Sequence, residues 1–172
     1  DALIKGYKLG MIGGGDAHVR MASSTGIMGV YAKELTRESL WEAMINRRVY
    51  ATTGAKMKMD FNVNGFFMGS IIKVNQYTID SLYPLSISIA VKGTAPLQKV
   101  ELLENNCVVK TQNKWTDKDG SICFNVTLQN QGVNVSNCSR FYYIRAYQQD
   151  GNMAWSSPIW VDFTMNEEDS YE

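Results

Sequence analysis

The chain has 172 residues with 17 basic and 17 acidic side chains, so its formal net charge at pH 7 is zero. This balance lacks the basic surplus of nucleic-acid-binding proteins and the acidic surplus of a solvated tail. No stretch approaches the roughly 20 consecutive apolar residues that a membrane-spanning helix needs. We therefore expect neither nucleic acid nor a membrane as a partner. The length fits one large domain, or one domain plus a piece of another.

The chain begins with Asp1 rather than Met, so we interpret it as a processed or excised piece. No signal peptide is present from which a cytoplasmic or an exported location could be predicted. The three cysteines, Cys107, Cys123 and Cys138, contain no C-x-x-C pair. We expect them to be buried or half-buried thiols, and a Cys107–Cys123 or Cys123–Cys138 disulfide is the alternative if the protein is exported.

Near the start of the chain, the apolar run of residues 7–12 leads through Gly13–Gly15 to Asp16-Ala17-His18, which contains the only histidine. We interpret the apolar run as a strand. On extended backbone, side chains two residues apart point to the same side, so a carboxylate and an imidazole converge. This donor pair suits zinc, manganese or iron. The alternative is a turn carboxylate hydrogen-bonded to a neighbouring imidazole.

The residues around this pair are less specific. The glycine run lacks the G-x-G-x-x-G spacing and the Walker lysine of phosphate-binding loops, so we expect it to let backbone pass close to a crowded site. Arg20 could bind an anionic substrate, or it could be a solvated loop residue. Tyr50 and Thr52 are most simply packing residues.

A short strand over residues 26–32 and a helix follow. Thr36 is a plausible N-cap, and Glu38 lies in the first turn, where the helix dipole favours an acid. The helical spacing of Leu40, Trp41, Met44 and Ile45 predicts one apolar stripe. Arg47 and Arg48 are expected to close the helix, with an extension over residues 50–53 that ends at Gly54.

After residue 55 the hydrophobic period changes to two. Alternating segments with turn signals between them predict six to eight short strands. The segments are residues 57–63, 85–91, 100–103, 107–110, 122–128, 140–148 and 154–163, with turns at 64–65, 104–106, 117–120 and 150–152. This pattern is typical of an immunoglobulin- or fibronectin-like antiparallel β-sandwich. We place the sandwich at residues 55–165 and an acidic tail at 166–172.

Residues 1–54 cannot bury a core of their own, because two short strands and one helix enclose too little volume. They must either dock on the sandwich or belong to a larger domain whose earlier part is absent, and we favour the larger domain.

Several segments in this order resemble the C-terminal part of the polymerase and histidinol phosphatase (PHP) family of metal-dependent phosphoesterases. Residues 6–18 are similar to the last metal-ligand strand of that family, and residues 35–44 and 47–54 to the final helix and exit segment of one branch. The β domain that follows in that branch is matched by residues 61–65, 68–70, 142–148 and 155–160.

The resemblance implies a distorted α/β barrel that holds a two- or three-metal cluster and uses metal-activated water to attack a phosphoester or related ester. It assigns Asp16 and His18 as metal ligands. The other ligands of the family include further histidines, which this chain lacks. Residues 1–54 are then the end of such a barrel, no catalytic set is complete here, and the chain is expected to be inactive. Two ligands leave a divalent ion mostly hydrated, so this chain is expected to bind it weakly or not at all.

A non-catalytic binding module is the alternative function. Trp115, Trp155 and Trp160 lie in the predicted sandwich, where exposed aromatic rings could stack on sugar rings or contact a protein. Packing in or at the edge of a sandwich core explains the same strand spacing.

Overall fold

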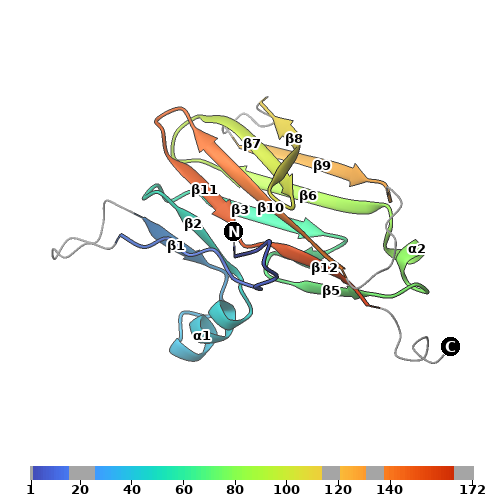
Figure 1. The fold of residues 1–172 in the computed structure, drawn as a ribbon. Helices are drawn as coiled ribbons and strands as arrows, with labels where there is room; N and C mark the ends of the chain where they lie inside the picture. Colours follow the sequence, from blue (N-terminus) through green and yellow to red (C-terminus); the bar gives the residue numbers. More distant parts are fainter. Residues whose placement is uncertain (1, 16–25, 114–120, 131–137, 165–172) are drawn as a thin grey trace.

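The computed structural model describes residues 2–15, 26–113, 121–130 and 138–164, which form a mainly β structure with antiparallel sheets (Figure 1). The predicted β class is therefore confirmed. The elements are β1 (Ile27–Val30), α1 (Arg37–Ile45), β2 (Val49–Thr52), β3 (Lys58–Val63), β4 (Phe66–Phe67), β5 (Ile71–Val74), α2 (Ile79–Leu82), β6 (Leu85–Lys92), β7 (Leu97–Glu104), β8 (Cys107–Gln112), β9 (Ile122–Leu128), β10 (Cys138–Gln148), β11 (Met153–Ser156) and β12 (Ile159–Phe163).

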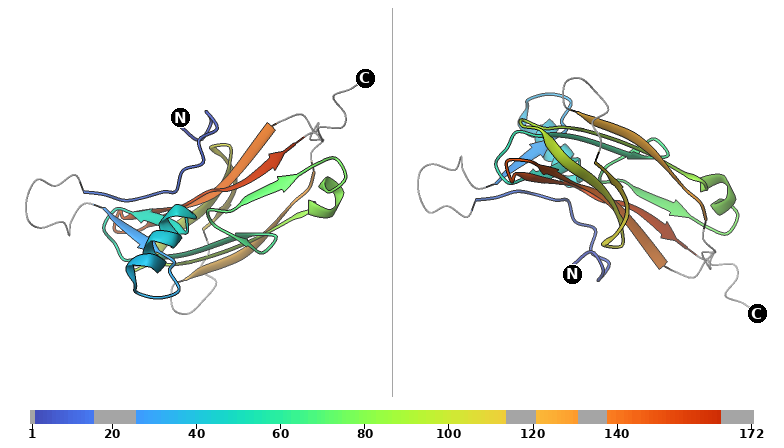
Figure 2. Two further views of the ribbon diagram at one scale, coloured as in Figure 1. Left: turned by 90° about the horizontal axis from the view of Figure 1, so that it is seen from below. Right: turned by 90° about the horizontal axis from the view of Figure 1, so that it is seen from above.

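The strands form two sheets that lie face to face (Figure 2). The eight-stranded sheet has the order β1-β2-β11-β10-β12-β5, and β7 and β8 extend it beside β10. The smaller sheet has the order β4-β3-β6-β9. All pairs are antiparallel except β12 with β5, which is parallel. Each sheet buries one face against the other, which is the usual solution for alternating strands.

The main core lies between the sheets and follows the predicted alternation. Along β6, Leu85, Ile87, Ile89 and Val91 are buried while the residues between them face outward. The turn between β3 and β4 has positive φ at Asn64 and Gly65, the conformation that a two-residue hairpin needs. Here the hydrophobic period and the turn residues agree, and the prediction is confirmed.

A second, smaller cluster lies on the opposite face of the eight-stranded sheet. Phe141 and Tyr143 alternate along β10 with core residues, so they point outward, and they pack with Leu103 and Trp160. We call these four residues the outer cluster. Leu3, from the start of the chain, packs against it.

Two predicted strands differ from the structure. Residues 154–163 form two strands instead of one, because Pro158 has no N–H to donate and the chain breaks at Ser157–Pro158. Residues 7–12 are described but belong to neither sheet. A strand requires ladder hydrogen bonds with a neighbour, and residues 7–12 take part in none of the strand pairs of the described residues. The prediction of a strand at 7–12 is therefore wrong for this structure.

The predicted boundary between residues 54 and 55 does not interrupt the sheet. β2 precedes it and β11 follows it, yet Ala51 pairs with Trp155 and Tyr50 with Ser156. Residues before 54 thus dock on the two-sheet body. That residues 1–54 also belong to a larger domain stays a prediction.

The cysteine prediction is wrong about burial. Cys107, Cys123 and Cys138 are all exposed and form no disulfide with one another. Cys107 begins β8, whose first five residues are exposed, and Cys123 faces outward on β9. The predicted turn at 117–120 and the tail at 166–172 lie outside the described residues. No helix in the described part of the chain is long and apolar enough to cross a membrane.

Candidate functional site

The predicted ligands Asp16 and His18 and the predicted substrate residue Arg20 lie outside the described residues. The residues that flank them in the sequence, 2–15 and those from 26 onward, are described. Residues 2–15, which we call the N-terminal segment, run along the outer face of the eight-stranded sheet (Figure 1). β1 begins immediately after residue 26.

Because glycine has no side chain, Gly13 and Gly26 allow the residues on the two sides of the predicted ligands to lie side by side. A Cβ on Gly13 would clash with the backbone carbonyl of Ile27, and a Cβ on Gly26 would lie 3.1 Å from the carbonyl oxygen of Gly14. Gly13 thus lets backbone approach the backbone of β1, whereas the approach to a metal site predicted for the glycine run concerns residues outside the described part of the chain. Gly14 and Gly26, on either side of the predicted ligands, are therefore adjacent in space.

A groove of about 650 Å³ opens beside these ends. The N-terminal segment forms one wall, and residues on the outer face of the sheet form the other. Groove-lining residues that bear on the argument are Gly13, Gly14, Thr52, Asn106, Tyr143 and Trp155. The groove is therefore a space beside Gly13, Gly14 and Gly26 in which a small molecule could lie.

The N-terminal segment is attached to the sheet at several points. Lys8 Nζ lies 2.5 Å from Asp162 Oδ1 and donates a 2.8 Å hydrogen bond to Ser139 Oγ. The backbone N–H of Met11 donates a 2.9 Å hydrogen bond to Ser157 Oγ. Sequence reasoning missed all of these contacts, because they join residues more than 130 positions apart.

Cations from two elements lie over the buried Trp160 ring. Lys8 Nζ is 5.5 Å and Arg47 Cζ 5.7 Å from the ring centroid, and the side chain is 1% exposed. Arg47 also donates through Nε to the carbonyl of Gly69, while Arg48 pairs with Glu42. The prediction that these two arginines close the helix is wrong in position, because α1 ends at Ile45, Asn46 is its C-cap, and its last turn holds no basic residue.

Two tyrosines join the strands on either side of the predicted boundary. Tyr50 donates a hydrogen bond to the carbonyl of Met57, and Tyr31 donates one to the carbonyl of Met59. Burial, with the charge of Asp60 and with Tyr50, raises the pKa of Tyr31 to about 12, and burial also raises the pKa of Tyr50. Both phenols therefore stay protonated at neutral pH and serve packing, as predicted for Tyr50.

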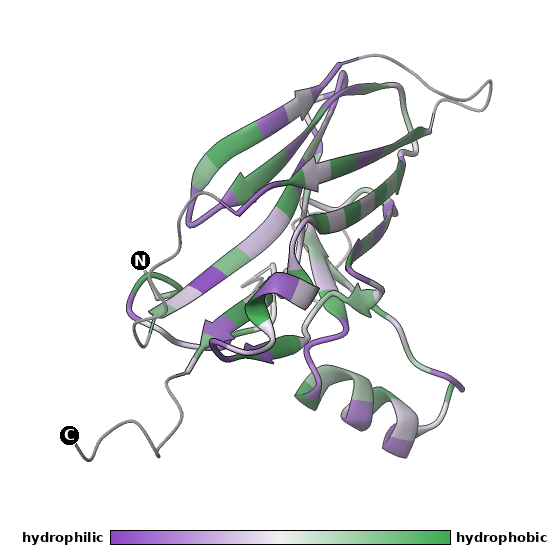
Figure 3. Cartoon of the chain, turned by 90° about the vertical axis from the view of Figure 1, so that its right-hand side faces the viewer, coloured by the Kyte–Doolittle hydropathy of each residue, from purple (hydrophilic) through white to green (hydrophobic). Residues whose placement is uncertain are grey.

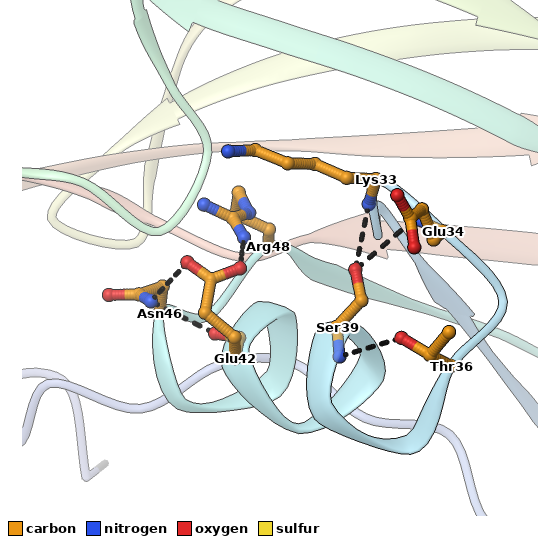
Figure 4. A network of polar contacts seen from close by, with 7 residues as sticks. All are labelled: Lys33, Glu34, Thr36, Ser39, Glu42, Asn46 and Arg48. Atoms are coloured by element: carbon orange, nitrogen blue, oxygen red, sulfur yellow. Dashed lines mark hydrogen bonds and ion pairs between the residues drawn. The ribbon is translucent and has the colours of Figure 1, made fainter.

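Polar contacts fix α1 at both ends (Figure 4). The Thr36 hydroxyl accepts from the N–H of Ser39, which confirms the predicted N-cap, and the Ser39 hydroxyl accepts from the N–H groups of Lys33 and Glu34. At the other end, Asn46 Nδ2 donates to the Glu42 carbonyl and carboxylate. These contacts hold the helix in place from its polar side.

The apolar side of α1 has almost no cover in this chain. Of its nine residues only Ala43 is buried, while Trp41 is 61% and Ile45 56% exposed. Leu35, just before the helix, is 92% exposed. The helical spacing predicted for this stripe is correct, but the stripe faces a shallow cavity of about 620 Å³ instead of a core. Figure 3 shows the helix standing away from the two sheets.

The three tryptophans that could have stacked on sugar rings differ from one another in their surroundings. Trp160 is buried in the outer cluster, so its ring cannot receive a sugar. Trp155 is half-buried and lines the groove beside Tyr143. Trp115 lies outside the described residues. In the described part of the chain there is no group of three or more His, Cys, Asp or Glu side chains that could hold a metal ion.

Comparison with known proteins gives relatives without an assigned activity. A family described as "Protein of unknown function (DUF3604)" matches residues 14–89, a stretch that includes Asp16 and His18 and crosses the predicted boundary at 54. An uncharacterized protein of Chlamydia pneumoniae is 36% identical over 153 residues, covering 81% of this chain and 23% of its own length. Uncharacterized proteins of Chlamydia trachomatis and Chlamydia muridarum are each 32% identical, with the same coverage.

The chain therefore spans about a quarter of the length of the curated relatives that it matches. No solved structure matches it.

Proposed function

We propose that this chain is the C-terminal part of a metal-dependent hydrolase of the PHP type that acts on phosphoesters or related esters. Asp16 and His18 supply two ligands to a zinc, manganese or iron ion, and Arg20 binds the anionic substrate. The remaining ligands come from a longer protein, which we call the parent. Its existence is supported by relatives about four times as long as the matched region.

The observation that carries the proposal is the Asp16-x-His18 spacing directly after a glycine run whose first residue, Gly13, lies against the backbone of Ile27. One carboxylate and one imidazole form a donor set that fits zinc, manganese or iron. A Cβ at Gly13 would be excluded by the Ile27 backbone, so the residues that flank the ligand pair lie close together. For such an ion, this chain contributes two ligands and the parent contributes the others.

In the intact enzyme the bound metal would supply a water whose pKa is lowered toward neutrality and a positive charge that stabilises the transition state. The residues of this chain bind and orient: Asp16 and His18 hold the ion, and the Arg20 guanidinium pairs with a phosphate oxygen. The groove beside Gly13 and Gly14 gives the substrate a place to lie.

The exposed apolar face of α1 supports the existence of the missing part. Leu35, Trp41 and Ile45 would be an unusual surface for a finished protein, because contiguous exposed apolar patches mark interaction sites. The longer relatives provide the occupant, namely the rest of the same chain. We propose that the catalytic part of the parent covers this face.

The test is hydrolysis of a generic phosphoester, 4-nitrophenyl phosphate, by the parent and by this chain, each with zinc, manganese or iron(II). We expect activity in the parent that is lost in His18→Ala, and none in this chain. Ile87→Val, a core change in β6 far from the loop, is the matched control and should retain activity. Activity of this chain by itself that His18→Ala abolishes would contradict the proposed truncation. If the parent hydrolysed none of the phosphoesters tested, the phosphoesterase assignment would be contradicted.

The alternative is a non-catalytic binding module. We infer this alternative from one observation, that Trp155 and Tyr143 line the groove with the polar side chains of Thr52 and Asn106. Aromatic rings beside polar groups can bind sugars. A glycan array would favour this reading if binding were found and then lost in Trp155→Ala. We also propose that residues 55–165 form an immunoglobulin- or fibronectin-like sandwich, which an experimental structure and its comparison with those folds would test.

A further inference from the structure

A polar cavity of about 660 Å³ lies at one end of the space between the two sheets. β6 begins and β9 ends there, since Leu85 pairs with Leu128. The cavity-lining residues that bear on the argument are Glu104, Asn105, Leu128, Gln129, Arg140 and Tyr142. None of these six lines the groove beside the N-terminal segment. This cavity, which we call the end cavity, is therefore separate from that groove.

The larger sheet directs charged side chains into this end of the space between the sheets. Tyr142 on β10 is 1% exposed and belongs to the main core, so its side chain points toward the smaller sheet. Glu104 on β7 is the direct cross-strand partner of Tyr142, and Arg140 lies two residues earlier on β10. Side chains in these two positions lie on the same face of the sheet as Tyr142. The core is thus apolar in its middle and charged at this end.

The two charges are paired with each other and remain partly open. Glu104 Oε1 accepts a 3.0 Å hydrogen bond from Arg140 Nη1 and one of 3.1 Å from the Tyr142 hydroxyl. The side chains of Arg140 and Glu104 are 26% and 23% exposed. A guanidinium carries five N–H groups, and the contact with Glu104 uses one of them. Arg140 therefore has further donors for a molecule in the end cavity, while the pair as a whole is neutral.

The walls of the end cavity favour a neutral ligand. An anion would compete with Glu104 for Arg140, and a cation would compete with Arg140 for Glu104, so either would leave a half-buried charge without its partner. A hydroxyl group both donates and accepts, so it can bind Arg140 without breaking the pair. The exposed amides of Asn105 and Gln129 provide donors and acceptors of the same neutral kind.

We propose that the end cavity is a binding site for a neutral, hydroxyl-rich molecule of the size of a mono- or disaccharide. Arg140, Asn105 and Gln129 bind its hydroxyl groups, and Leu128 contacts its apolar face. The volume lies within the range of small-molecule pockets, roughly 300–1,000 Å³. The proposal goes beyond the metal chemistry and requires no ion. It also differs from the alternative binding module, whose ligand would lie in the groove beside Trp155.

The first experiment locates the ligand. Glucose, galactose, mannose and N-acetylglucosamine are titrated separately into this chain, and amide signals are followed by ¹H–¹⁵N NMR. We expect at least one sugar to shift the signals of Gln129 and Arg140 in a saturable way. Signals of Thr52 and Trp155, which line the groove, should not move. Sodium acetate and inorganic phosphate are the charged probes and should leave Gln129 and Arg140 unchanged.

The second experiment tests the donors. Arg140→Lys keeps a positive charge beside Glu104 but removes the planar set of N–H groups, so it should weaken sugar binding by about tenfold or more. Arg145→Lys is the matched control, because Arg145 forms the same kind of pair with Glu101 on the outer face of β10. It should leave sugar binding unchanged. If Arg140→Lys fails to fold, Gln129→Ala, an exposed change after the end of β9, should weaken binding by about threefold.

Three results would overturn the proposal: no shift with any of the four sugars, shifts confined to Thr52 and Trp155, or equal weakening in Arg140→Lys and Arg145→Lys. Tighter binding of acetate or phosphate than of any sugar at Gln129 and Arg140 would contradict the neutral class of ligand. None of these results depends on Asp16 or His18, so the proposed function stands or fails separately.

Discussion

The regions before and after residue 54 bury their apolar side chains very differently. Among the described residues, eight of the twelve large apolar side chains that are exposed lie in the first 45 positions. Before residue 54, the only described apolar residues that are buried are Ala43, Val49 and Ala51. The later region places nearly all of its large apolar side chains in one core. The first region therefore contacts the second on one side and leaves apolar side chains exposed on the other.

This difference identifies which contacts stabilise the chain as it stands. The later region is stable through its own packing. The first region depends on β2–β11 pairing and on the anchors of the N-terminal segment, while the apolar face of α1 is exposed. The predictions below test this division, in order of decreasing effect.

The largest effect should follow from a cavity in the core between the sheets. Phe61 on β3 is fully buried, so Phe61→Ala should lower the free energy of unfolding by about 3–5 kcal/mol. Urea denaturation of the chain measures this. A loss below about 1 kcal/mol would mean that the core between the sheets does not dominate stability.

A pH-dependent effect is expected at Glu101, which accepts hydrogen bonds from Lys99 and Arg145. Burial by itself raises the pKa of Glu101, but these two partners lower it, and the net pKa lies below the ordinary value of 4.5. A lowered pKa in the folded state stabilises the protein above the unfolded pKa, and this contribution is lost as the pH falls through the folded value.

Glu101→Gln should therefore destabilise the chain at pH 7 by about 1–3 kcal/mol, as expected for a charged hydrogen bond. The difference in the free energy of unfolding between this variant and the unsubstituted chain should become smaller below pH 4.5. Urea titrations at pH 7 and pH 3.5 measure both values. An equal difference at the two pH values would show that the charge of Glu101 does not contribute.

A smaller effect is expected at the helix start. Thr36→Ala removes the N-cap hydroxyl bonded to Ser39 and should cost about 1 kcal/mol of local helix stability. Hydrogen exchange in α1 should accelerate, with little change in exchange along β6. Equal acceleration in both elements would mean that α1 unfolds together with the two sheets. That result would contradict the difference between the regions before and after residue 54.

The smallest effect in this chain is expected at Trp41. Trp41→Ser should change the free energy of unfolding of this chain by less than about 0.5 kcal/mol, because the side chain is mostly exposed. In the parent the same change should cost about 3 kcal/mol or more, since the ring would be buried there. Equal small effects in both proteins would contradict the proposed cover of α1.

The parts of the fold that the sequence predicts are those governed by local rules. The alternation of β6 and the Asn64–Gly65 turn depend on neighbouring residues alone. β5 was missed because Ile71–Val74 is short and its partner β12 is almost 90 residues away. The break at Pro158 was visible in the sequence, since proline interrupts a strand, but its consequence for Ser157 was not.

The candidate site was predictable only as a pair of residue types. Asp16 and His18 are identifiable from spacing and resemblance, and they lie outside the described residues. The anchors Lys8 and Ser157 carry no local signal, because each acts through a partner that is distant in sequence. The exposure of Trp41 could not be predicted either. An apolar stripe indicates that one helix face is buried, but it does not identify the segment that covers this face.

Calorimetric titration of zinc and manganese into the parent, beside its Asp16→Ala/His18→Ala double variant, tests the central claim most directly. The account predicts binding tighter than about micromolar, or about −8 kcal/mol, in the parent, with loss in the double variant and weak or absent binding to this 172-residue chain. Equally tight binding to this chain would show a complete site within it. Binding to the parent that the double variant leaves unchanged would contradict the assignment of Asp16 and His18 as ligands.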